Sequence, residues 1–159
     1  MIKILSYILG TLVAVIALLL IVSTFPIAGN YELLIVQSGS MEPAIKIGSI
    51  VLIKPAGEYR VGDIITFGPV SKTKIPTTHR IAEIRRLNGS LTYVTRGDAN
   101  GNNDDKEVLA RQVIGKVLFD IPYAGYVLAV AKKPIGFAIL IIIPAFLLIF
   151  DEAKKIFKE

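Results

Sequence analysis

Residues 77–95, TTHRIAEIRRLNGSLTYVT, carry the clearest indication of the fold. They contain two short runs of apolar and alternating residues, 77–86 and 91–95, with Asn88-Gly89 between them. Asn-Gly is a preferred pair in the two-residue turns that join antiparallel strands, because both positions of such a turn need a positive φ. The stretch therefore predicts a β-hairpin with Asn88-Gly89 at its turn.

The same pattern continues on both sides of this hairpin. Short apolar or alternating runs are separated by turn residues, such as Pro55 and Gly57 and the Gly/Asn-rich loop 99–103, and no helical period is sustained. The further candidate strands are residues 32–37, 49–54, 63–67 and 112–119. We therefore predict a mostly β domain over residues 26–133.

Two uncharged apolar runs, residues 4–25 and 134–150, flank this domain. They account for a composition with 53% hydrophobic and only 19% charged residues, whereas soluble domains carry roughly 25% charged residues. Their lengths are 22 and 17 residues, and a membrane-spanning helix needs ~20 apolar residues. We predict an N-terminal transmembrane anchor (1–25), a second C-terminal transmembrane helix (134–150) and a cytoplasmic tail (151–159).

Each apolar run has an alternative interpretation. The first could be a cleavable signal sequence, but it exceeds the roughly 7–15 residues of a signal core, and Pro26-Ile27 interrupt the place where a small-residue cleavage site would lie. The second is near the lower length limit, and Gly136 and Pro144 interrupt it, so a buried core helix or a re-entrant segment remains open. We expect an uncleaved anchor and a spanning second helix.

The basic residues near the first run indicate its orientation. Lys3 precedes the run, and no Lys or Arg follows it before Lys46. The positive-inside rule then places the N-terminus in the cytoplasm and the β domain on the extracytoplasmic side. The expected location is the cell membrane, or the endoplasmic reticulum membrane in a eukaryote, with the lipid bilayer as a partner.

Charge and residue counts exclude several classes of partner and site. The net charge of +5 is spread along the chain without the stripe of Lys, Arg and aromatic residues that nucleic acids need. We therefore expect no nucleic acid partner and some attraction to anionic lipid headgroups. The chain has no Cys and one His, His79, which excludes disulfides, Cys-ligated zinc and multi-histidine metal sites, and leaves a carboxylate-only metal site open.

Three segments hold residues that could carry chemistry: Ser38-Gly39-Ser40, the lone His79, and the loop bracketed by Asp98 and Asp104. Each also has an ordinary interpretation. The serine segment could be a simple loop, the histidine could be structural, and the aspartate loop could be a solvated turn or a calcium-binding loop. Together they supply a hydroxyl nucleophile, an imidazole whose ordinary pKa of about 6.5 suits a general base, and a carboxylate to orient it. The combination indicates nucleophilic catalysis.

The order of these segments and their amino-acid sequences resemble those of type I signal peptidases of the archaeal and endoplasmic-reticulum branch. The resemblance rests on an N-terminal anchor, with Ile121-Pro122-Tyr123 as a further landmark, and it covers nearly the whole chain to about Asp105. Bacterial relatives carry Lys where this chain has His79. The matching boxes are Ser38-Gly39-Ser40-Met41-Glu42-Pro43, Tyr59-Arg60-Val61-Gly62-Asp63-Ile64-Ile65, Thr78-His79-Arg80 and Gly97-Asp98 to Asp104.

The resemblance implies a small, coiled β-sheet or barrel domain of the signal-peptidase kind and a role for each matched residue. Ser40 would attack the scissile carbonyl, His79 would take its proton and Asp104 would orient the imidazole. Asp98 matches a second acidic position, which either touches His79 or holds the loop. Ser38 would complete an oxyanion hole with the Ser40 backbone N–H.

The activity that the resemblance implies is removal of signal peptides from exported preproteins after small residues, without a cofactor. Partner subunits or the secretion translocon remain open as partners. Two alternative functions account for part of the same sequence features. One is a non-enzymatic, membrane-anchored β module in which the boxes are turns, and the other is a soluble self-cleaving regulator, which would need lysine in place of His79.

Overall fold

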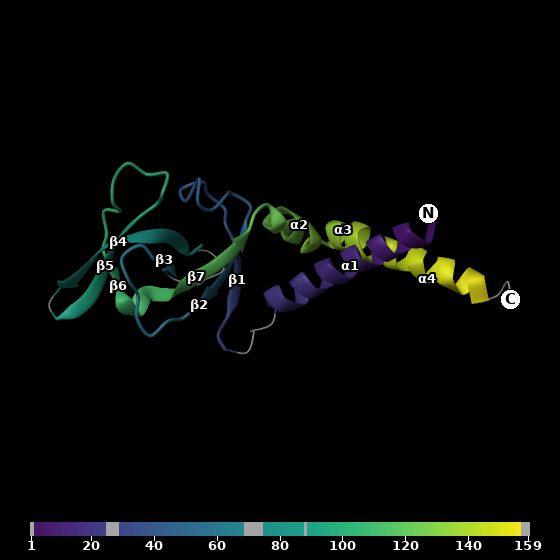
Figure 1. Cartoon of the computed structure of the whole chain (residues 1–159), viewed down its shortest axis with the longest axis horizontal. Coiled ribbons are helices and arrows are strands. Elements are labelled where there is room, and N and C mark those ends of the chain that lie inside the picture. The colour runs from purple at the N-terminus through teal and green to yellow at the C-terminus, as the bar shows by residue number, and fades with distance from the viewer. Residues whose placement is uncertain (1, 25–28, 69–74, 88, 157–159) are drawn as a thin grey trace. The chain divides into compact units, whose positions relative to one another are not determined.

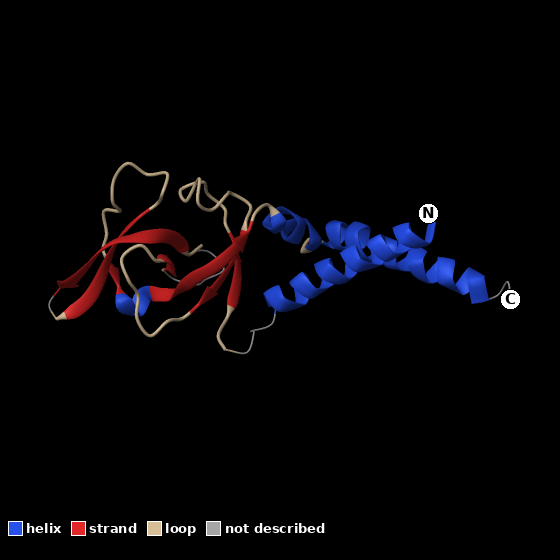
Figure 2. Cartoon of the chain, in the orientation of Figure 1, coloured by secondary structure: helices blue, strands red, loops and turns tan. Residues whose placement is uncertain are grey.

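The computed structural model describes residues 2–24, 29–68, 75–87 and 89–156 (Figure 1). The chain divides into two compact units, one formed by Pro26–Gly125 and the other by Met1–Phe25 together with Tyr126–Glu159. The first unit consists of strands with one short helical turn, η1 (Ala110–Gln112), and the second consists of helices (Figure 2). We call them the β unit and the helical unit.

The β unit is a single antiparallel sheet curved into a half-barrel, as the sequence predicted. The strand order across the sheet is β1-β2-β7-β3-β4-β5-β6, so β1 and β6 are its edges. The last strand of the chain, β7, lies in the interior of the sheet between β2 and β3. The strands are β1 (Glu32–Ile35), β2 (Ile50–Lys54), β3 (Ile64–Phe67), β4 (Thr77–Leu87), β5 (Ser90–Arg96), β6 (Val108–Leu109) and β7 (Val113–Ile121).

The predicted hairpin is formed by β4 and β5. Leu87 pairs with Ser90, which leaves two residues for the turn. Gly89 has a φ of 78°, the left-handed value that such a turn requires, and Asn88 lies outside the described residues. The strand β6 was not predicted, because its two residues are too short to show an alternating pattern.

Two clusters of buried side chains form the core of the β unit. Met41 and Ile45, from the loop between β1 and β2, pack with Val51 and Ile53 of β2. Burying a side chain of this size contributes roughly 1.5–3 kcal/mol. The second cluster lies under the other half of the sheet and consists of Ile65, Ile81, Tyr93 and Val108.

The strand β7 joins the two halves, because it pairs with β2 on one side and with β3 on the other. Its Gly115 faces the backbone of Lys54, and a Cβ on this glycine would lie 2.7 Å from the Lys54 carbonyl carbon. Only glycine therefore lets β7 approach β2 this closely. Register shifts at Leu52/Ile53 and Thr66/Phe67 accompany these pairings, and such bulges bend a strand.

The helical unit contains α1 (Ile2–Thr24), α2 (Ala124–Ala131) and a long helical segment made of α3 (Pro134–Phe137), η2 (Ala138–Ile142) and α4 (Ile143–Ile156). The widened turn η2 ends two residues before Pro144, which has no N–H to donate to the preceding turn.

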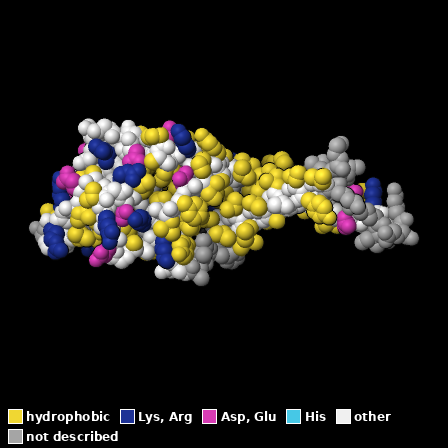
Figure 3. Space-filling model, viewed as in Figure 1, with side chains coloured by type: hydrophobic (Ala, Val, Ile, Leu, Met, Phe, Trp, Pro, Cys, Tyr) yellow, Lys and Arg dark blue, Asp and Glu magenta, His cyan; other side chains and the backbone are white. Residues whose placement is uncertain are grey.

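Both α1 and the long C-terminal segment are long and apolar enough to cross a membrane. Only 6% of each apolar window is buried, which argues against a buried core helix at the C-terminal run. Hydrophobic side chains accordingly dominate the surface of this unit in Figure 3.

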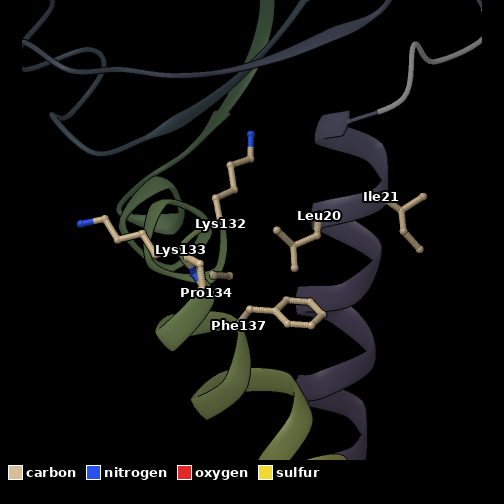
Figure 4. Close-up of a pocket in the computed structure, with 7 residues that line it drawn as sticks. Leu20, Ile21, Lys132, Lys133, Pro134 and Phe137 are labelled. Carbon is tan, nitrogen blue, oxygen red and sulfur yellow. The ribbon is translucent and has the colours of Figure 1, made fainter.

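The helix α2 was not predicted, and it crosses the boundary between the units. Leu128 and Ala131 are its buried residues, and residues 126–133, which we grouped with the β domain from sequence, belong to the helical unit. A cavity of about 450 Å³ lies where α1 ends and the long segment begins. Leu20 and Phe137 point into the space between these helices, and Lys132 and Lys133 also line the cavity (Figure 4).

Candidate active site

The loop between β1 and β2 carries Ser38 and Ser40. The Glu42 N–H donates to the Gly39 carbonyl (3.0 Å), which turns the chain sharply around Ser40. Met41 follows at once and is 1% exposed in the first core cluster. The serine is therefore held in place by the burial of its neighbour, while its own side chain remains half-buried.

His79 lies on β4, where it pairs with Ile65 of β3. It shares the buried face of the strand with Ile81, and its ring and that of Phe67 lie in an edge-to-face arrangement with a centroid distance of 6.3 Å. The imidazole is thus fixed by a paired strand and by apolar packing.

Asp104 lies in the loop between β5 and β6, and its carboxylate reaches back to His79. Its Oδ2 is 2.6 Å from His79 Nδ1, and on the other side of the ring Nε2 is 3.1 Å from Ser40 Oγ. With the ring proton on Nδ1, donated to the carboxylate, Nε2 is free to accept the serine proton. The structure therefore brings Ser40, His79 and Asp104 into the geometry of a Ser-His-Asp triad.

Ser38 lies beside this array. Its exposed hydroxyl is 3.3 Å from Ser40 Oγ. A hydroxyl in this place can donate toward a charge that develops next to Ser40.

Asp98 forms an ion pair with Arg80 instead of binding His79. Arg80 Nε donates to Oδ1 (2.9 Å) and Nη2 to Oδ2 (2.6 Å), while Nη1 donates to the Gly62 carbonyl (2.8 Å). The hydrogen bond to Asp98 raises the pKa of Arg80, although burial opposes this shift. The sequence left open whether Asp98 touches His79 or holds the loop, and this geometry fits a residue that holds the loop.

Asp98 thereby fixes a loop that touches the candidate nucleophile. The next residue, Ala99, donates its N–H to the Ser40 carbonyl (2.9 Å). A Cβ on the preceding Gly97 would lie 2.5 Å from the same carbonyl oxygen and 3.0 Å from His79 Nε2. The loop can pass over the serine and the imidazole only because residue 97 has no side chain.

Gly62 and Asp63 have a structural part beside the site. Both hold the backbone of Ile81, two residues after His79, through Gly62 N–H and the Asp63 carbonyl (2.9 Å each). Burial raises the pKa of Asp63, but the hydrogen bond from Lys116 and that from the Arg60 N–H outweigh it, so the pKa is lowered overall. A charged Asp63 therefore stabilises this turn.

Sequence reasoning missed three residues of this site: Arg80, Thr95 and Gly97. Thr95 donates its hydroxyl to Asp104 Oδ2 (2.6 Å). Arg80 and Gly97 lie inside the quoted boxes, next to His79 and Asp98 respectively. This adjacency could have identified them as site residues from the sequence. Among the described residues, no group of three His, Cys, Asp or Glu side chains could hold a metal ion.

No protein-family model matches the chain, but curated proteins do. It is 38% identical over 113 residues to Signal peptidase I W of Bacillus subtilis, covering 67% of this chain and 58% of the relative. It is 34% identical over 116 residues to the signal peptidase complex catalytic subunit SEC11 of Tuber melanosporum, and 36% over 108 residues to that of Pyrenophora tritici-repentis, covering 60% of each chain in both cases.

The chain thus spans about three fifths of the length of the relatives that it matches. The two apolar helices agree with a membrane protein. The relatives that it matches and the boxes quoted from its sequence indicate the same family: this chain is a relative of the type I signal peptidases of the archaeal and endoplasmic-reticulum branch.

Proposed function

We propose that the protein is a membrane-bound serine endopeptidase that removes N-terminal signal peptides from exported preproteins after small residues. The observation that carries the proposal is the hydrogen-bonded array of Ser40, His79 and Asp104 in a relative of signal peptidases. A non-enzymatic β module would not require a serine hydroxyl 3.1 Å from an imidazole that a carboxylate orients.

In the proposed reaction, Ser40 Oγ attacks the scissile carbonyl carbon and its proton passes to His79 Nε2. The tetrahedral intermediate collapses, the C–N bond breaks, and the imidazolium gives its proton to the leaving amine. Water then attacks the ester carbonyl carbon and gives a proton to His79, and the imidazolium passes this proton to Ser40 Oγ as the C–O bond breaks. This releases the carboxylate of the signal peptide and restores the Ser40 hydroxyl. Asp104 stabilises the imidazolium throughout.

The edge strand β1 is the proposed place for the extended end of the signal peptide. It pairs only with β2 among the described strands, so its outer backbone groups can pair with a further strand. β1 ends at Ile35, five residues before Ser40. A peptide added along this edge would run toward the serine.

Cleavage of a full-length preprotein by the purified, detergent-solubilised chain tests the proposal. We expect one cut after a small residue, located by mass spectrometry of the product. A matched preprotein with large residues one and three positions before the cut should stay intact. Absence of cleavage by the folded protein both alone and with added membrane extract, or a cut that ignores side-chain size, contradicts the proposal.

The same assay tests the need for partners. The SEC11 relatives are named as catalytic subunits of a complex, whereas the name of Signal peptidase I W mentions no complex. If cleavage appears only after membrane extract is added, partner subunits or the secretion translocon are required.

Ser38→Ala is expected to lower turnover by roughly 10²–10³-fold, because it removes one donor to the oxyanion and leaves the nucleophile and base in place. The Michaelis constant should change little. Steady-state kinetics with a signal-peptide substrate measure both quantities. A rise in the Michaelis constant with unchanged turnover would instead assign Ser38 to substrate binding.

The proposed orientation, with the β unit outside the cytoplasm, can be tested with sealed right-side-out vesicles. An added protease should cut within residues 99–103, all of which are exposed, and should spare residues 154–159. Permeabilised vesicles serve as the control, in which the tail is also cut. Cutting of the tail in sealed vesicles would show that residues 134–150 do not span the membrane.

A further inference from the structure

Thr95 is a buried polar residue that the proposed mechanism does not yet use. It lies near the end of β5, is 0% exposed, and pairs with Ile81 of β4. Its hydroxyl donates to Asp104 Oδ2 (2.6 Å), and its carbonyl accepts the Asp104 N–H (2.8 Å). One strand residue thus holds both the backbone and the carboxylate of Asp104.

Asp104 needs such support because its own surroundings do not fix it. It belongs to no helix or strand, it follows the exposed residues 99–103, and its side chain is 24% exposed. A carboxylate in this position could turn toward water. The hydroxyl of Thr95 comes from a paired strand and binds the same oxygen, Oδ2, that accepts the proton of His79 Nδ1.

We propose that Thr95 is a positioning residue of the active site, an inference that rests on the proposed function. By fixing the rotamer of Asp104, Thr95 keeps Oδ2 in front of His79 Nδ1. The ring proton is then held on Nδ1, and Nε2 stays unprotonated opposite Ser40. Thr95 acts through Asp104 and touches neither the serine nor the imidazole by any described hydrogen bond.

Thr95→Val tests this role, because valine keeps the shape of threonine and replaces the hydroxyl with a methyl group. We expect turnover to fall by roughly 10- to 100-fold, the factor that corresponds to one hydrogen bond to a charged group, with little change in the Michaelis constant. Thr95→Ser keeps the hydroxyl and should restore most of the turnover.

Thr92→Val is the matched control. Thr92 is also buried on β5, at 1% exposure, and its hydroxyl also donates to a carboxylate, Glu107 Oε2 (2.8 Å). That pair lies at the β5–β6 pairing, outside the catalytic array. The control should lower the melting temperature in the way that Thr95→Val does and should leave turnover unchanged.

A readout independent of activity comes from the single histidine of the chain. Nitrogen-15 labelling of histidine gives signals from one imidazole, and their chemical shifts report which ring nitrogen carries the proton once the ring is neutral. Wild type, Thr95→Ser and Thr92→Val should show the Nδ1–H tautomer. Thr95→Val should show a mixture of the two tautomers.

An unchanged tautomer in Thr95→Val overturns the inference, and so does an equal loss of turnover in Thr95→Val and Thr92→Val. If wild type fails to cleave any preprotein while Thr95→Val still changes the tautomer, the proposed function fails and the positioning role of Thr95 stands. The two failures are therefore distinguishable.

Discussion

Ser40→Ala and His79→Ala are each expected to lower preprotein cleavage by several orders of magnitude, because each removes one partner of the 3.1 Å contact on which proton transfer depends. The double variant should lose no more than either single variant, since the two residues act as a unit. Initial rates from a fixed amount of enzyme, compared on a logarithmic scale, measure the loss.

The β unit should remain folded in these variants. Ser40 is only half-buried, and the core clusters contain neither residue. Melting curves check this, and Ser90→Ala, an exposed serine of the β4–β5 hairpin, is the control for loss of a hydroxyl elsewhere. Near wild-type turnover in either single variant would exclude the proposed mechanism.

Asp104→Asn is expected to have the next largest effect, a loss of roughly 10⁴-fold in turnover. The amide can present its NH₂ group to the ring in place of a carboxylate oxygen, which favours the wrong tautomer of His79 and no longer stabilises the imidazolium. The melting temperature of this variant should change little, although its turnover falls strongly. Turnover and thermal unfolding of the same preparation measure the two effects.

Asp98→Asn provides the contrast, because Asp98 binds Arg80 and not His79. Loss of this ion pair should loosen the loop that places Ala99 on the Ser40 carbonyl. We expect a lower melting temperature and a smaller loss of turnover than in Asp104→Asn. The reverse result, with activity lost only in Asp98→Asn at an unchanged melting temperature, would exchange the roles of the two aspartates.

The sequence alone could not decide between these aspartates, and the reason is geometric. Both bracket the same loop, and which one faces His79 depends on the path of the chain between them. Arg80 pairs with Arg96 across the β4–β5 hairpin, which leaves Asp98 beside Arg80. Asp104 reaches the imidazole because its N–H returns to the Thr95 carbonyl. Neither contact follows from spacing.

Other parts of the fold were predictable because they depend on local pattern. The alternating runs and Asn88-Gly89 indicated β4 and β5, and the uncharged runs indicated the two long apolar helical segments. The unpredicted parts depend on close approach between distant segments. Residue 97 must be glycine because a Cβ there would lie 2.5 Å from the Ser40 carbonyl oxygen. Thr95 is useful only because Asp104 folds back onto it.

The place of β7 in the sheet bears on when the chain acquires its chemistry during synthesis. Ser40 lies in the half formed by β1 and β2, whereas His79 and Asp104 lie in the half formed by β3 to β6. Among the described strands, only β7 pairs with both halves. Residues 113–121 leave the ribosome after all the other strands. Before these residues are synthesised, no described strand is available to pair with both halves. The proposed hydrolytic activity therefore depends on the described strand that is synthesised last, because its pairing with β2 and β3 joins the half that carries Ser40 to the half that carries His79.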